Sequence, residues 1–95
     1  MPTLVVTHVM RDFDAWKEMF ESDPLGREAS GVRRHRILRA TDDPNDVTIE
    51  LDFDTMGEAE SLRGRLQEMW TTGGPRLGLE SPKARVLDEV ERKDY

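Results

Sequence analysis

Residues 47–53, Val-Thr-Ile-Glu-Leu-Asp-Phe, alternate strictly between apolar and polar side chains. Because successive side chains of a strand point to opposite faces, this period of two predicts a strand with one buried and one polar face. Directly after it, Thr55 and Glu58 have the spacing of a capping box, which marks the start of a helix. Apolar residues then recur on one helical face and predict a helix from about Thr55 to Thr71; they are Ala59, Leu62, Leu66, Met69 and Trp70.

Upstream of this pair, the chain contains a second strand and a turn. The Asx- and proline-rich residues 42–46 predict a turn. Before the turn, Val32 to Thr41 forms an extended segment, which the turn joins to the strand at 47–53 as a hairpin. Downstream, Gly73-Gly74-Pro75 predicts the end of the long helix. A loop from Arg76 to Lys83 and a last strand from Ala84 to Val90 follow.

The chain begins with a strand and a shorter helix. Residues Thr3 to Met10 are β-branched and apolar on both faces, a composition typical of a central strand. Asp12 or Asp14 then offers an N-cap. Three aromatic side chains follow at helical spacing, and the helix ends at Ser22-Asp23-Pro24 because the residue before proline avoids the α region; the aromatic residues are Phe13, Trp16 and Phe20.

The resulting element order is βαββαβ. It predicts an α+β, ferredoxin-like domain in which an antiparallel sheet carries both helices on one face. The other face of the first strand then exposes Val5, Thr7 and Val9. An uncovered apolar strip on a central strand favours packing against a second copy, so we expect a homodimer.

Composition limits the class of protein. The chain has 95 residues and 10.9 kDa, which suits one domain over residues 1–95. Apolar and charged residues each make up 36%, the net charge is −6, and cysteine is absent. This excess of acid argues against nucleic-acid binding, and the lack of cysteine excludes disulfides and thiolate chemistry. No apolar run approaches the about 20 residues that span a bilayer, so we expect a cytoplasmic protein without membrane contact.

His8 is the first candidate catalytic residue. It shares a strand face with Leu4, Val6 and Met10. On the helix side, its imidazole could accept a proton near neutral pH. The alternative interpretation is a neutral core histidine that bonds to the backbone.

His35 is the second candidate, and its direction depends on the hairpin register. A register that sets Arg34 opposite Asp54 and Arg36 opposite Asp52 pairs opposite charges and turns His35 to the helix side. A slip of one residue would bury both arginines without partners. We prefer the first register, which also turns Arg39 to the helix side. The alternative for His35 is a half-exposed edge residue.

Other side chains could line a pocket on the helix side. Aromatic and methionine residues at helical spacing are usually core, but the same residues would wall an apolar cavity; they are Trp16, Phe20, Phe53, Met69 and Trp70. Two histidines without a nearby carboxylate make a poor metal site, so we expect neither a metal nor a cofactor. The basic residues of the hairpin face acidic residues 42–60, which favours internal pairing over anion binding.

Residues 8–16, His-Val-Met-Arg-Asp-Phe-Asp-Ala-Trp, followed by Phe20, resemble the opening of the dimeric α/β-barrel proteins, the antibiotic-biosynthesis-monooxygenase-like group and its uncharacterised relatives. The hairpin at 39–47, followed by Phe53-Asp54, is similar too, and the resemblance covers residues 3 to about 90. It implies a homodimeric barrel with a cavity between each sheet and its own helices. Some of these proteins oxidise polyketide-like phenols with oxygen alone, others degrade haem, and the Asn-Trp-His set of the haem-degrading branch is not found here.

We therefore expect a protein that binds a small aromatic or polyketide-like molecule. The enzymatic version is cofactor-independent monooxygenation, in which His8 or His35 removes a phenolic proton and Trp16 and Trp70 enclose the anion. The alternatives are a non-catalytic small-molecule-binding protein and a stress-related or scaffold dimer with a filled core.

Overall fold

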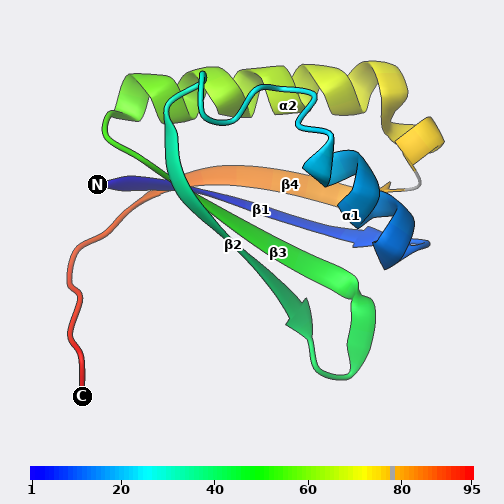
Figure 1. The fold of residues 1–95 in the computed structure, drawn as a ribbon, viewed down its shortest axis with the longest axis horizontal. Helices are drawn as coiled ribbons and strands as arrows, with labels where there is room; N and C mark the ends of the chain where they lie inside the picture. Colours follow the sequence, from blue (N-terminus) through cyan, green and yellow to red (C-terminus); the bar gives the residue numbers. More distant parts are fainter. Residues whose placement is uncertain (78) are drawn as a thin grey trace.

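The computed structural model describes residues 1–77 and 79–95. A four-stranded antiparallel sheet, in the order β2-β3-β1-β4, carries both helices on one face (Figure 1). The elements are β1 (Pro2–Met10), α1 (Phe13–Glu21), β2 (Val32–Ala40), β3 (Asp43–Phe53), α2 (Met56–Leu77) and β4 (Leu79–Asp88). The predicted ferredoxin-like α+β fold is confirmed, including the pairing of the first strand with the third.

The core lies between the sheet and the helices. Along β1 and most of β3, buried and half-buried residues alternate as the period of two predicts. Leu4, Val47 and Phe53 are completely buried, and α2 adds Ala59 and Leu62 from above. The apolar face of the sheet is therefore covered by the apolar stripes of the helices.

Helix α1 is short and is held at both ends. Of the two predicted N-caps, Asp12 is the one used, since its Oδ1 accepts a hydrogen bond from the Ala15 N–H at 3.2 Å. The helix ends at Glu21, and Asp23 then adopts φ +55°, a left-handed conformation that Asp tolerates better than most residues. The chain turns here toward β2, as the Ser22-Asp23-Pro24 pattern predicts.

The hairpin turn is tighter than predicted. The reversal uses only Thr41 and Asp42, and β3 begins at Asp43, which pairs with Ala40. The predicted turn residues 44–46 instead form an irregularity within β3, because the register shifts between Arg39 and Ala40. The Asx chemistry is used locally there: Asp43 Oδ1 accepts from the Asn45 N–H at 3.0 Å.

The end of α2 was also predicted wrongly. The helix runs through Gly73-Gly74-Pro75 to Leu77, and β4 begins at Leu79 instead of Ala84 and ends at Asp88 instead of Val90. Packing of α2 on β4 and β1 offsets the roughly 1 kcal/mol that each helical glycine costs relative to alanine. The predicted loop also included residue 78, which lies outside the described residues.

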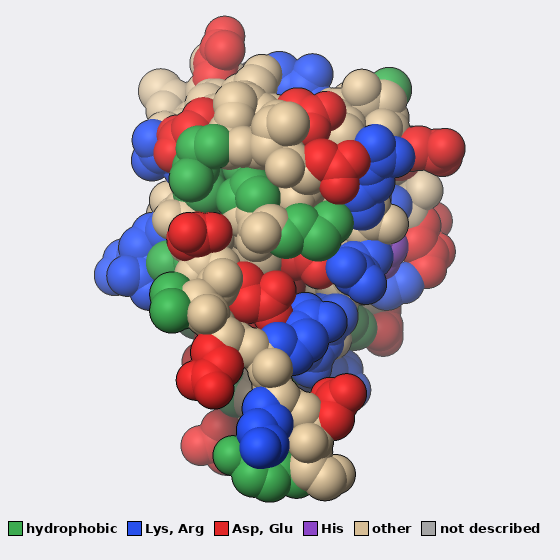
Figure 2. Space-filling model, turned by 90° about the vertical axis from the view of Figure 1, so that its left-hand side faces the viewer, with side chains coloured by type: hydrophobic (Ala, Val, Ile, Leu, Met, Phe, Trp, Pro, Cys, Tyr) green, Lys and Arg blue, Asp and Glu red, His purple; other side chains and the backbone are tan. Residues whose placement is uncertain are grey.

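The surface at the left-hand end of Figure 1 is highly charged. Acidic and basic side chains are interspersed there, and hydrophobic side chains form only small, separate patches (Figure 2). The C-terminal segment beyond β4 extends away from the sheet on the side opposite the helices (Figure 1). Within the described residues, no helix is long and apolar enough to cross a membrane.

Candidate functional site

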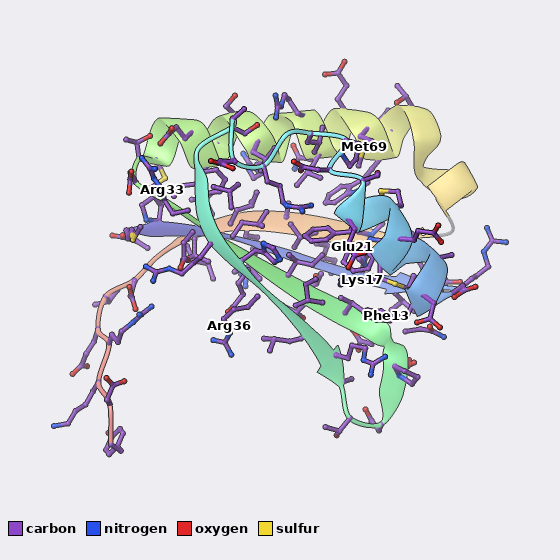
Figure 3. All side chains as sticks on the ribbon, in the orientation of Figure 1. Phe13, Lys17, Glu21, Arg33, Arg36 and Met69 are labelled. Carbon is purple, nitrogen blue, oxygen red and sulfur yellow. The ribbon has the colours of Figure 1, made fainter. Side chains whose placement is uncertain are left out.

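A pocket of about 70 Å³ lies between the helix side of the sheet and the two helices. Its walls are almost entirely apolar. Of the predicted site residues, His8, Trp16, Phe20, Met69 and Trp70 line it. Met69 lies on the side of α2 that faces α1 (Figure 3). Of the residues that line the pocket, Met19, Met69 and Trp70 are half-buried. The structure thus brings together five side chains from β1, α1 and α2.

His8 is the one buried polar residue of the described chain, at 4% exposure. Its Nδ1 is buried and has no hydrogen-bond partner among the described residues. The Trp16 ring meets the imidazole edge-on, with centroids 5.4 Å apart. Burial lowers the pKa of His8 below its ordinary value of 6.5, so the imidazole is neutral at pH 7 and offers one donor and one acceptor nitrogen.

A bulge in β4 lies directly opposite His8. Thr7 pairs with Lys83 and Val9 with Glu80, so Ser81 and Pro82 together oppose the single residue His8. Ser81 adopts φ +48°, a left-handed backbone conformation that is uncommon for a residue other than glycine. Bulges of this kind re-aim neighbouring side chains and are frequent beside functional sites.

A row of rings connects His8 to the outer edge of the sheet. Trp16 stacks on Phe20 with a centroid distance of 5.1 Å, and Phe20 meets His35 edge-on at 5.2 Å. The rings of α1 therefore form a continuous wall with one histidine at each end. His8 lines the pocket, whereas His35 lies on exposed β2, outside the pocket wall.

The hairpin register differs from the predicted one by two residues. Arg34 lies opposite Asp52 and Arg36 opposite Glu50, because the chain reverses at Thr41 and Asp42 and residues 44–46 are extra residues of β3 opposite the step from Arg39 to Ala40. A shift of two keeps every side chain on its predicted face, so His35 does turn to the helix side. Its pKa is lowered by burial and by the positive charges of Arg27 and Lys17. Arg39 also turns to this side, and its guanidinium lies 4.6 Å from the Phe13 ring centre.

Phe53 and Arg27 depart from the expected set of pocket residues. Phe53 is completely buried in the core and does not line the pocket. Arg27, from the connection between α1 and β2, does line it, with its guanidinium 3.8 Å from the Phe20 ring centre. An arginine beside Gly26, in an irregular connection, carries no periodic signal that would indicate its direction. In the described part of the chain, no cluster of three or more His, Cys, Asp or Glu residues has a metal-binding arrangement.

Comparison with solved structures confirms the ferredoxin-like fold. Neither a protein-family model nor a curated protein matches the sequence. A mutant of SnoaB, a cofactor-independent oxygenase from Streptomyces nogalater, superposes with a TM-score of 0.70 and 17% identity over 96% of this chain and 94% of that chain.

Two further solved structures agree with this assignment. A candidate antibiotic biosynthesis monooxygenase from Deinococcus radiodurans has a TM-score of 0.67 and 11% identity, over 100% of this chain and 98% of that chain. A dimeric ferredoxin-like protein from an uncultured marine organism has a TM-score of 0.62 and 10% identity, over 99% and 98%. At these identities the likeness establishes the fold, and the predicted resemblance is confirmed at that level.

Proposed function

We propose that the pocket binds a small aromatic molecule with a hydroxyl group, and that His8 accepts the proton of that hydroxyl. The observation that carries this proposal is the buried Nδ1 of His8, which has no hydrogen-bond partner among the described residues and lies beside a largely apolar pocket. Leaving a buried polar atom unpaired costs about 1–3 kcal/mol. A phenolic hydroxyl both donates and accepts, so it can pair with either nitrogen of the neutral imidazole.

The size of the pocket favours a single ring over a fused polyketide. A cavity of about 150 Å³ holds one benzene, whereas this pocket measures about 70 Å³. The rim must therefore open by a small amount to admit a ring. Methionine side chains are flexible, and Met19 and Met69 at the rim can make this adjustment.

The chemistry we propose for the bound phenol is oxygenation without a cofactor. Proton transfer to His8 leaves an electron-rich phenolate between Trp16 and Trp70, where water is excluded. Reaction with oxygen places one oxygen atom on the ring as a carbonyl and releases the other as water, and the substrate supplies all four electrons. The fold it shares with SnoaB supports this reaction class.

We also propose that the protein is a homodimer that packs through the open face of the sheet into an α/β barrel. Leu38 and Leu87 are 39% and 41% exposed, and the pairing registers place them on that face beside half-buried Val5 and Val9. Arg36 of the same face projects away from the helices (Figure 3). Solved proteins of this fold described as dimeric support the same arrangement.

A panel of single-ring phenols and quinols tests the proposed activity. Binding should quench tryptophan fluorescence, because both tryptophans line the pocket. An oxygen electrode should record oxygen consumption. Its rate should fall as the pH drops below the pKa of His8. His8→Gln should lower turnover by about 10²–10⁴-fold and binding much less, whereas His35→Gln should leave both unchanged.

Two outcomes would contradict this activity. If no phenol quenches fluorescence or consumes oxygen, the pocket has no such ligand. If phenols bind without oxygen consumption, the protein is the non-catalytic small-molecule-binding alternative.

A further inference from the structure

We propose that Arg27 is an anion anchor at the mouth of the pocket, so that the pocket selects aromatic ligands that carry a carboxylate. This inference rests on the proposed function, because it concerns the ligand of the same pocket. It adds a second recognition point to the hydroxyl recognised by His8.

The position of Arg27 supports this role. Its guanidinium lies over the Phe20 ring at 3.8 Å, and Phe20 is part of the pocket wall, so the cation is held beside the cavity by its aromatic contact. The side chain is only 20% exposed. A charge that is largely removed from water interacts more strongly with an incoming anion than a surface lysine or arginine does.

The existing contacts of Arg27 leave donors for a ligand. Nη1 donates to the Phe20 carbonyl at 2.7 Å and lies 3.5 Å from Asp23 Oδ1. Both contacts use the same nitrogen, and the guanidinium has further N–H groups in a planar fork that matches a carboxylate. Asp23 Oδ1 is itself occupied by the backbone N–H of Arg27 at 2.9 Å.

Charges of both signs lie near this part of the wall. Arg27 and Lys17 lower the pKa of the neighbouring His35, and each has an acidic partner, Asp23 and Glu21 respectively. The wall between the two recognition points consists of Trp16 and Phe20. A ligand with a hydroxyl at one end of a flat ring and an anionic group at the other end would contact both points along this wall.

Calorimetric titration with matched acids and esters tests the anchor. The probes are 4-hydroxybenzoate and 4-hydroxycinnamate, each beside its neutral methyl ester, which keeps the phenol and removes the charge. For the acid whose length suits the pocket, we expect about tenfold tighter binding than for its ester. The preference should shrink as salt concentration rises, since part of the site is open to solvent.

Variants separate the anchor from a general charge effect. Arg27→Gln should abolish the preference for the acid and leave ester binding in place. Arg39→Gln is the matched control, because Arg39 also lies over a ring of α1 but does not line the pocket. Asp23→Asn, which keeps the shape and removes the competing carboxylate, should tighten acid binding and leave the ester unchanged.

Each result decides the question. Equal binding of both acids and their esters, or an equal loss in Arg39→Gln, would overturn the anchor while the proposed phenol binding stands. If neither acids nor esters bind, the anchor and the proposed function fall together. Should Arg27→Gln fail to fold, Asp23→Asn and the salt dependence still test the charge.

Discussion

The two faces of strand β1 show how the same strand serves two purposes. On the helix side, Leu4, Val6, His8 and Met10 are between 0% and 4% exposed. On the other side, the alternating residues Thr3 to Val9 are only half-buried. Apolar residues stand on both sides, so burial here depends on what covers the strand. The helices make one face a core and leave the other uncovered.

The two faces also differ in whether their polar side chains are paired. On the open face, Asp52 accepts from Thr3 Oγ1 at 2.7 Å and from Arg34 at 2.8 Å, and Arg36 lies 3.5 Å from Glu50. These arginines are exposed, so such pairs contribute little to stability. On the helix face, His8 is buried, and its Nδ1 has no hydrogen-bond partner among the described residues. A buried polar atom without a partner costs free energy, whereas paired charges at the surface cost little.

The largest effect should come from placing a charge on the open face. Val5→Lys would bury an ammonium group without a partner at the proposed dimer interface, which costs several kcal/mol. Light scattering at micromolar concentration should show the mass fall from twice 10.9 kDa to 10.9 kDa.

Val5→Thr is the control, because it keeps the branched shape without a charge and should remain dimeric. If the wild-type protein is monomeric at high concentration, the proposed dimer through the open face of β1 is wrong.

On the helix-covered face, truncation should destabilise the monomer fold itself. Leu62 is 1% exposed, so Leu62→Ala should reduce the free energy of unfolding by about 2–5 kcal/mol. Urea denaturation followed by circular dichroism measures this change. Met56, at the start of the same helix, is 50% exposed, and Met56→Ala should change stability by less than about 0.5 kcal/mol. Similar losses in both variants would show that α2 does not cover the sheet as described.

The strands and helices could be predicted because their signals are local. The alternation at 47–53 and the stripe from Ala59 to Trp70 each identify one element and its buried face. The errors in the ends of the elements and in the hairpin register come from tertiary effects. Gly73-Gly74-Pro75 predicts a helix end, but packing against the sheet extends α2 to Leu77. The hairpin register moves by two residues because the reversal uses Thr41 and Asp42 and residues 44–46 are extra residues of β3, which no local pattern indicates.

The candidate site was predictable only in part. Helix periodicity places Trp16 and Phe20 on one face of the first helix, and strand periodicity groups His8 with one face of the first strand. The direction of that strand face toward the helices is what the family resemblance implies. Arg27 lies in an irregular connection, where no period indicates direction. The separation of His35 from the pocket depends on the Phe20 ring between them, which is a matter of side-chain packing. Phe53 is expected in the pocket because it lies on the helix-covered face of the sheet. The pocket occupies only part of that face, and Phe53 lies outside that part.

A smaller effect should follow from loosening the start of the covering helix. Thr55 Oγ1 accepts from the Glu58 N–H at 3.2 Å, which is the hydroxyl half of the predicted capping box, and it donates to Glu58 Oε1 at 3.0 Å. Thr55→Ala should therefore lower the free energy of unfolding by about 0.5–2 kcal/mol. The hydroxyl of Thr71 donates to the Gln67 carbonyl within the same helix. Thr71→Ala should change the free energy of unfolding by less than about 0.5 kcal/mol in urea denaturation. Equal losses would mean that the cap adds nothing specific.

The smallest effect concerns the pH dependence that distinguishes the buried face from the open one. In the folded protein the pKa of His8 is lowered by burial, and unfolding restores the ordinary value of 6.5. Between these two values the unfolded chain binds more protons than the folded one. Stability is therefore full above pH 6.5 and falls as the pH drops below it, with a slope of up to about 1.4 kcal/mol per pH unit.

Urea denaturation from pH 7.5 to pH 5 measures this slope. His8→Gln should remove most of it, because glutamine does not titrate. His35→Gln should remove little, since His35 is exposed and solvent screens its charged form. An unchanged slope in His8→Gln would mean that His8 is protonated as easily in the folded chain as in the unfolded one. His8 would then not be the buried, neutral proton acceptor of the proposed function. The helix side of β1 would be a hydrophobic core without a catalytic base.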